Sequence, residues 1–419
     1  MGAIRKAIAF IWKTLAGTIL CQFSLTSILV VGWTYRLMQR SALKRWWSMS
    51  PARFSGTTFA EFLSSDATTR EHQRFPNWVV RSNAITETKE ALREASGLRG
   101  KFRALRRGMF GSLWRNAVVG FQGIANTWVL TFLPTLFWVF GWYSGWDNSF
   151  NKGYEQFSVG IILSWIGIGL FILAMLYVPM AQARQAVTGE WRRFYEFRTV
   201  RRLIKRRRMA CLLLAACFSL LSIPLSILKT APYFVQNDNP EMEAMTDAQL
   251  LEWLISYFFW VSAVGFVLFV AIRLLMTRVY AGALVEAVQA GDLALDELGE
   301  FEREALARLE LSDAKERSPR HLVVRAAGFA ARPFWAAGIG AATIVVWFTF
   351  IAQIYVSEFV NYHPRRGFMN QPLVQLPWLR YVPDHLREGA DASVDSTTDF
   401  DASLVTNKPI PDPVHSKNS

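Results

Sequence analysis

The sequence predicts an all-helical fold: a polytopic integral membrane bundle of five or six transmembrane helices, with amphipathic helices on its cytoplasmic side. Hydrophobic residues make up 52% of the 419 residues, but the mean hydropathy is only +0.18, so the apolar residues must be concentrated in blocks. One block, residues 160–180, is uncharged, long enough to cross a bilayer, and followed at once by a basic, aromatic segment. The net charge of +13 is carried largely by Lys and Arg beside such blocks, which the positive-inside rule explains better than nucleic-acid binding.

Residues 1–35 combine an amphipathic start with a first transmembrane or re-entrant segment. Ile4, Ile8 and Ile11 recur at helical spacing with lysines opposite, a pattern typical of a helix on a membrane surface. Residues 15–35 are long enough to span, but four polar side chains in their middle also fit a re-entrant or interfacial element. Basic residues flank this segment on both sides, so both alternatives stay open. The N-terminus is outside if the segment spans and inside if it does not.

Residues 36–115 form a basic cytoplasmic region with sixteen Lys and Arg residues. One helix within it has a charged face and an apolar face, which must pack on lipid headgroups or on another cytoplasmic segment. Gly97 and Gly100 weaken its middle, where we expect a bend. The apolar face comprises Ala91, Ala95, Leu98, Phe102 and Leu105.

Residues 116–276 form the transmembrane core. Its loops 141–156 and 229–252 each carry one basic residue and are therefore expected outside, whereas the connection 181–209 carries ten and is expected in the cytoplasm. Arg273 lies close enough to the end of its span to be expected to reach the headgroups. The four predicted spans are about 117–140, 157–180, 210–228 and 253–276.

The apolar side chains of the basic connection change face midway. Those of residues 191–195 share one side of a helix, and those of residues 197–204 lie nearly opposite. This change predicts a break near Glu196, or a helix contacted on two sides by protein and lipid.

Residues 277–334 form an acidic cytoplasmic helical segment, with nine acidic and three basic residues between positions 292 and 316. We expect its helix to dock on the arginine cluster at 201–208 or on that at 99–107, in this chain or in a second copy. Reversal of the three central glutamates to lysine should loosen the contact. The candidate partner or lipid contacts are Trp191, Arg201, Arg202, Arg206, Arg207, Arg208, Glu300, Glu302 and Glu304.

A last span is predicted at about 335–356, and residues 357–419 form an extracytoplasmic tail, disordered from about 387. A weak internal repeat is also present: QAVTGEW at 185–191 and EAVQAGDL at 286–293 each follow an apolar run and precede a cytoplasmic helix. It indicates duplicated span–helix–span units. The expected location is a bacterial cytoplasmic (inner) membrane.

Motifs for chemistry are absent from the sequence: there is no P-loop, HExxH, GxSxG or dinucleotide fingerprint, and the five histidines are scattered. We therefore expect no catalytic residues, cofactor or metal. The candidate intramembrane polar residues Gln122, Asn126 and Ser164 either bond neighbouring helices or line a path. The leading expectation is a non-enzymatic structural or partner-binding component, whose partners are anionic lipid headgroups and another protein or a second copy, but not nucleic acid. The alternative is a channel or permease for a small neutral solute, and the third is a membrane enzyme acting on lipid.

The stretch PMAQARQAVTGEWRRFYEFRTVRRLI, at residues 179–204, joins the end of a span to a small-residue helix and then to an aromatic, basic segment. It resembles a family of bacterial and archaeal polytopic membrane proteins of unknown function, over residues 107–276. The resemblance implies an integral membrane location and no catalytic residues.

Overall fold

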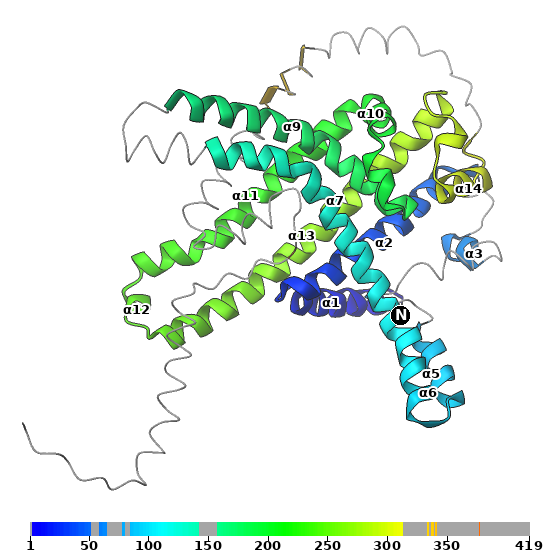
Figure 1. Cartoon of the computed structure of the whole chain (residues 1–419), viewed down its shortest axis with the longest axis horizontal. Coiled ribbons are helices and arrows are strands. Elements are labelled where there is room, and N and C mark those ends of the chain that lie inside the picture. Colours follow the sequence, from blue (N-terminus) through cyan, green and yellow to red (C-terminus); the bar gives the residue numbers. More distant parts are fainter. Residues whose placement is uncertain are drawn as a thin grey trace, which may run out of the picture.

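Every regular element of the described part of the chain is a helix (Figure 1). The computed structural model describes residues 2–51, 58–64, 78–79, 84–141, 157–312 and a few between 333 and 377. Three stretches are long and apolar enough to cross a membrane: Gly97–Pro134, Trp165–Thr188 and Asp247–Gln289. Two shorter apolar helical stretches are Ala7–Leu20 and Arg208–Phe218.

Four long helices, α2, α7, α9 and α13, pack together at the centre of the molecule, and α11 packs along α13 (Figure 1). The apolar predicted spans at 117–140, 157–180, 210–228 and 253–276 lie within α7, α9, α11 and α13 respectively, because each apolar run continues into polar helical turns. Their bounds are α2 Ser24–Met49, α7 Gly111–Gly141, α9 Phe157–Thr188, α11 Arg208–Asp238 and α13 Asp247–Gln289.

The N-terminal residues form a helical hairpin, not one continuous span. Helix α1 (Gly2–Leu20) ends before a turn at residues 21–23, and α2 begins at Ser24. Side chains bond the backbone around this turn: Gln22 Nε2 donates to the Thr18 carbonyl at 3.2 Å, and Ser27 Oγ donates to the Ser24 carbonyl at 2.6 Å. Residues 15–35 are therefore not one continuous helix, and the polar residues in their middle bond backbone carbonyls on either side of the turn.

Glycines let α2 and α7 cross with their backbones in contact. A Cβ atom built on Gly120 would lie 2.1 Å from the carbonyl oxygen of Ile28, and one on Gly32 would lie 1.9 Å from that of Asn116. Any larger residue at either glycine would therefore push the two helices apart.

Helices α9 and α13 end in the same way. Helix α9 stops before Gly189 (φ +75°), and a 3₁₀ turn, η5 (Trp191–Tyr195), leads to the short helix α10 (Phe197–Arg206). Helix α13 stops before Gly291 (φ +73°), and its chain continues through η6 (Leu295–Glu297) and α14 (Glu300–Arg308). The break predicted near Glu196 is confirmed. The weak sequence repeat thus has a counterpart in local structure.

Helices α10 and α14 lie at one end of the bundle, beside the C-terminal turns of α2, α9 and α13 (Figure 1). We call α10, η5, η6, α14 and the last turns of α9 and α13 the charged layer. The indole N–H of Trp46, near the end of α2, donates to the Ala281 carbonyl of α13 at 3.1 Å. The Gln39 amide donates to the Val187 carbonyl of α9 at 2.9 Å. These bonds hold three helix ends together.

The region before α7 folds into α3 (Phe59–Ser64), α5 (Ala84–Glu94), α6 (Gly97–Leu105) and the π-helical turn η2 (Arg106–Phe110). The helix predicted here is broken between α5 and α6, and Gly97 has φ +74°, a conformation that favours glycine. The α5–α6 pair projects away from the bundle (Figure 1). Apart from isolated residues, the predicted last span and the C-terminal tail lie outside the described residues.

Candidate functional site

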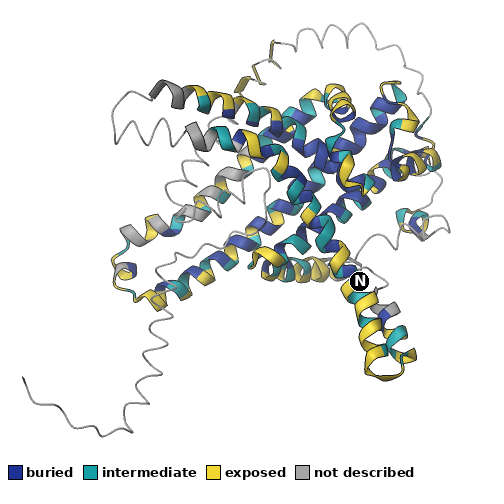
Figure 2. Cartoon of the chain, viewed as in Figure 1, coloured by how far each residue is buried: buried dark blue, intermediate teal, exposed yellow. Residues whose placement is uncertain are grey.

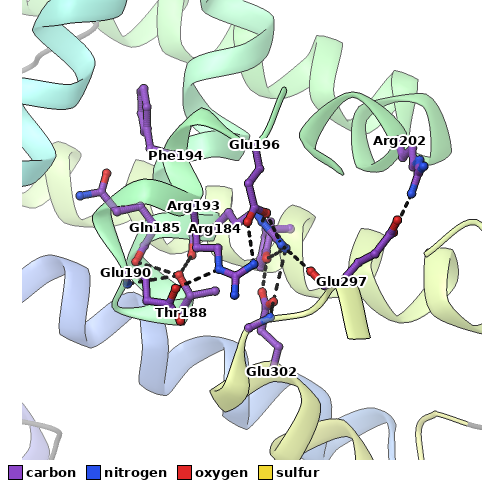
Figure 3. Close-up of polar contacts among 12 residues, drawn as sticks. Arg184, Gln185, Thr188, Glu190, Arg193, Phe194, Glu196, Arg202, Glu297 and Glu302 are labelled. Atoms are coloured by element: carbon purple, nitrogen blue, oxygen red, sulfur yellow. Dashed lines mark hydrogen bonds and ion pairs between the residues drawn. The ribbon is translucent and has the colours of Figure 1, made fainter. Parts of the chain in front are cut away.

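Arg184 and Glu302 form a fully buried ion pair inside the charged layer (Figure 3). Both side chains are 0% exposed, and Nη1 of Arg184 lies 3.3 Å from Oε2 of Glu302. The hydroxyl of Tyr280 donates to the other carboxylate oxygen, and the backbone N–H of Gly299 donates to Oε2 at 3.0 Å. Arg184 belongs to α9, Tyr280 to α13 and Glu302 to α14, so this cluster joins three helices.

The same arginine connects to α10. Its Nε donates to Glu196 at 2.6 Å, and its Nη2 donates to the backbone carbonyl of Glu297 at 3.2 Å. Glu196 also accepts a hydrogen bond of 2.6 Å from Arg193, which in turn bonds Glu190 at 3.0 Å. Charges of opposite sign therefore alternate from the exposed edge of the layer to its interior (Figure 3). Pairing of this kind is what makes burial of charge tolerable.

Two groups of the η5 turn have shifted pKa values. Partial burial alone would lower the pKa of Arg193, but the hydrogen bonds and charges of Glu196 and Glu190 outweigh it and raise the pKa. Burial raises the pKa of Tyr195. Near neutral pH, Arg193 is therefore a cation and Tyr195 a neutral hydrogen-bond donor.

Three more ion pairs lie at the solvent-facing side of the layer. They join the basic helix α10 and the residue after it to the acidic segment and to the end of α13. The acidic segment does pair with the cluster at 201–208, within one chain, but through Asp292 and Glu297, which precede its helix. The helix α14 itself packs against α9 and α2. The pairs are Arg202–Glu297 at 2.6 Å, Arg206–Asp292 at 3.5 Å and Arg207–Glu286 at 2.6 Å.

The predicted contact residues divide into two groups. Arg202, Arg206, Arg207 and Glu302 are engaged inside the protein by the contacts above. The others have exposed side chains and remain candidates for contact with a partner or lipid: Trp191, Arg201, Arg208, Glu300 and Glu304.

Arg184 was not singled out in the sequence, although it is the centre of the cluster. It is the first charged residue after the uncharged run of α9, so it was counted with the cytoplasmic basic residues. Gln182 and Gln185, close to Arg184 in the sequence, could have indicated that Arg184 is buried. Three long polar residues within four positions at the end of a span need buried hydrogen-bond partners.

Asn126 lies buried in α7 and bonds across the bundle, as expected of an amide inside a membrane protein. Its Nδ2 donates at 3.1 Å both to the side chain of Gln185 on α9 and to the backbone carbonyl of Trp191, and its Oδ1 accepts from the hydroxyl of Tyr195 at 3.1 Å. Gln122 is half-buried on α7, and Ser164 lies on α9. The arrangement at Asn126 is that of interhelical hydrogen bonding.

Arg273 does not reach outward, contrary to expectation. Its side chain is buried in α13, 1% exposed, and it donates to the amide oxygen of Gln182. Its guanidinium carbon lies 4.9 Å from the centre of the Phe269 ring. Gln182 in turn donates to the hydroxyl of Thr127 on α7 at 2.6 Å. Snorkelling fails here because α13 continues for sixteen residues past Arg273, to Gln289, and the face that carries Arg273 is turned toward Gln182 of α9.

No protein-family model matches the chain, and neither a curated protein nor a solved structure matches it. The resemblance to a family of polytopic membrane proteins therefore stays a prediction. The site itself is a set of buried polar groups that bond one another across helices. Such a set stabilises a tertiary arrangement and can hold a surface in a fixed shape.

Proposed function

We propose that this protein is a non-enzymatic structural or partner-binding component of a membrane assembly, located in a bacterial cytoplasmic membrane with the charged layer in the cytoplasm. The buried pair of Arg184 and Glu302 carries the proposal. It joins the ends of α9 and α13 to both short helices of the layer. A rigid, charged platform at the inner ends of membrane helices is suited to protein contact, whereas a catalyst needs reactive groups that are free to meet a substrate.

The outer surface of this platform would supply the contact. Trp191 and Arg201 are exposed on its basic part, Arg208 is exposed next to it at the start of α11, and Glu300 and Glu304 are exposed on its acidic part. The ion pairs described above do not use these four charged side chains. Their charges are therefore available for a partner with the opposite pattern. Such charges set partner choice and association rate more than affinity.

The topology that we propose places the N-terminus in the cytoplasm. The turn at residues 21–23 lies at the depth of α13's apolar middle, because Gly17 contacts the ring of Phe266, and Trp33 of α2 stacks on the same ring at 6.2 Å. The basic residues of α1 and of α2 both lie away from the turn, and Lys13 of α1 is close enough to Arg40 of α2 for their charges to interact. A re-entrant hairpin entering from the cytoplasmic side fits these contacts.

Single cysteines test this topology in sealed vesicles of known orientation, with native cysteines replaced. We expect Ile4→Cys and Ser48→Cys to react with an impermeant reagent from the same, cytoplasmic side, and Ser24→Cys to be unreactive from either side. Reaction of the first two from opposite sides would show instead that residues 15–35 cross the membrane.

Affinity purification in mild detergent tests the proposed function. We expect a stoichiometric protein, or a second copy, to remain bound to the wild type and to be lost from Arg201→Glu with Arg208→Glu. Glu241→Lys, on an exposed residue of the short helix α12 (Pro240–Glu243) before the far end of α13, is the matched control and should retain the partner. A chain that runs alone as a monomer, with no partner detected by mass analysis, would contradict the proposal.

The alternative of a channel or permease for a small neutral solute requires polar groups that are free to meet that solute. The three hydrogen bonds of Asn126 to α9 and η5 count against a role for this residue in a path. Flux into liposomes that is abolished by Asn126→Leu, without loss of folded protein, would revive the alternative.

A further inference from the structure

Helix α10 has an exposed, basic side. Its inner side is buried, and Val200 and Leu203, both 0% exposed, belong to the central core. On the opposite side three basic residues at helical spacing, Arg198, Arg201 and Lys205, are exposed (Figure 2). Within the described part of the chain, none of the three takes part in an ion pair. We call these three residues the outer face of α10.

The two flanks of the outer face differ in character. On one flank, Arg202 and Arg206 pair with the acidic segment. On the other flank lie the apolar residues Phe197, which is 52% exposed, and Ile204, which is half-buried. The ring of Phe197 stacks on that of Tyr177 of α9, with the ring centres 4.9 Å apart. The outer face therefore lies between a flank that meets acidic residues and a flank that meets an apolar helix.

Both ends of α10 are connected to apolar helical stretches. Tyr177, on which the first residue of α10 stacks, lies within the apolar stretch Trp165–Thr188 of α9, and its hydroxyl donates to the Phe194 carbonyl at 2.5 Å. The other end of α10 leads into α11, whose residues 209–228 carry no charge. Helix α10 thus lies where one apolar stretch ends and the next begins, which is the place of a connection at a membrane surface.

The depth of α10 along α13 agrees with this position. The guanidinium of Arg207, the residue after α10, packs on Gly282 of α13, because a Cβ atom built there would lie 2.3 Å from its Nη1. Gly282 is sixteen residues past Phe266, at the level of the turn at 21–23, and sixteen helical residues span about 24 Å. The headgroup layer of a bilayer extends to about 20–22 Å from its middle. Any tilt of α13 shortens the depth, so α10 lies at the headgroups.

We propose that the outer face of α10 binds the phosphate groups of anionic phospholipids in the leaflet next to the charged layer. The proposal rests on the proposed function in one respect, that this layer faces the cytoplasm. Basic segments beside a membrane helix are attracted to anionic headgroups. The exposed ring of Phe197 beside the outer face favours a lipid surface, because a helix with an apolar flank and adjacent cations lies in the membrane interface.

The test measures binding of a fluorescent phosphatidylglycerol to the full-length protein in mild detergent, with a fluorescent phosphatidylcholine of the same acyl chains for comparison. We expect tighter binding of phosphatidylglycerol, and a smaller difference at high salt because surface charges are screened. Arg198→Gln with Lys205→Gln should weaken phosphatidylglycerol binding roughly fivefold for each basic residue removed. Phosphatidylcholine binding should not change. Arg198→Lys with Lys205→Arg keeps both charges and should bind like the wild type.

Lys89→Gln with Arg93→Gln, on exposed positions of α5, removes the same two charges and is the matched control. It should keep the affinity for phosphatidylglycerol. Equal affinity for the two lipids, or equal losses in the two double variants, would overturn the proposal. Displacement of the labelled lipid by inorganic phosphate would also overturn it, because the site would then bind a free anion and not a headgroup.

The lipid test and the partner test fail separately. Arg201 belongs to both the outer face and the proposed partner surface, so the lipid test leaves it unchanged. A protein partner lost from Arg201→Glu with Arg208→Glu, without any preference for phosphatidylglycerol in the wild type, would overturn the lipid proposal alone. A preference for phosphatidylglycerol in a chain that binds no partner would support the lipid proposal and contradict only the proposed function.

Discussion

The segments that follow α9 and α13 share one local design but have opposite charge. Each leaves a long helix through a glycine with positive φ, passes through a 3₁₀ turn and enters a short helix. The segment after α9 is basic and the segment after α13 is acidic. The shared backbone puts the two short helices at the same end of the bundle, and the opposite charges let the residues before α14 pair with α10.

The two segments are joined by two kinds of ion pair, one buried and one exposed to solvent. Arg184 and Glu302 are fully buried, whereas Arg202 and Glu297 are 43% and 39% exposed. Removing one partner of a buried pair leaves a charge without water or counter-charge, but an exposed charge is solvated again at once. We therefore expect the buried pair to determine whether the two segments dock, and the exposed pairs to adjust how tightly.

The largest effect is expected from Glu302→Lys. This change would place two cations beside each other in the interior, at a cost of at least about 3–5 kcal/mol, the range for breaking a buried pair. Unfolding in detergent and protease cleavage after α13 would measure it. Glu300→Lys and Glu304→Lys, on exposed positions of the same helix, are the controls and should change the unfolding free energy by less than about 0.5 kcal/mol. Similar losses for all three would show that the docking depends on net charge, not on the buried pair.

An intermediate effect is expected from the glycine with positive φ at which each of the two segments leaves its long helix. Gly189→Val and Gly291→Val should each destabilise the protein by about 1–2 kcal/mol, because an L-residue resists the left-handed conformation. A Cβ at either glycine meets nothing within 4 Å, so the loss would be conformational and not steric. Gly169→Ala, in the middle of α9 and also in open space, is the control and should stabilise the helix by about 0.5–1 kcal/mol. A loss at only one of the two glycines would argue that the segments are not equivalent.

The smallest effect is expected from the exposed pair. Arg202→Glu should cost at most about 1 kcal/mol, and the loss should shrink as salt is added. Combining it with Glu297→Arg restores opposite charges and should recover most of the stability, which a double-mutant cycle measures. If the double variant is no better than the single one, Arg202 and Glu297 contribute packing instead of charge attraction.

Much of the fold followed from patterns that are local in the sequence. The apolar runs in α7, α9, α11 and α13, the change of face near Glu196 and the complementary charge of the two segments were all visible in the residues. The turn at residues 21–23 was less clear, because polar residues inside an apolar run fit either a span or a hairpin. The positions of Arg184 and Arg273 could not be read from sequence, since a basic residue at the end of a span looks the same whether it meets water or another helix.

The sequence by itself determined which segments are helical, which are apolar enough for a membrane and which carry each charge, because these properties depend on composition and periodicity along the chain. Only the tertiary structure decided which arginine meets which glutamate. That choice depends on where α9, α13 and α14 place side chains 118 residues apart, as in the bond from Arg184 to Glu302. It also decided that the acidic segment pairs with α10 and leaves the basic side chains of residues 99–107 exposed, because burial and distance, not charge alone, determine which opposite charges pair.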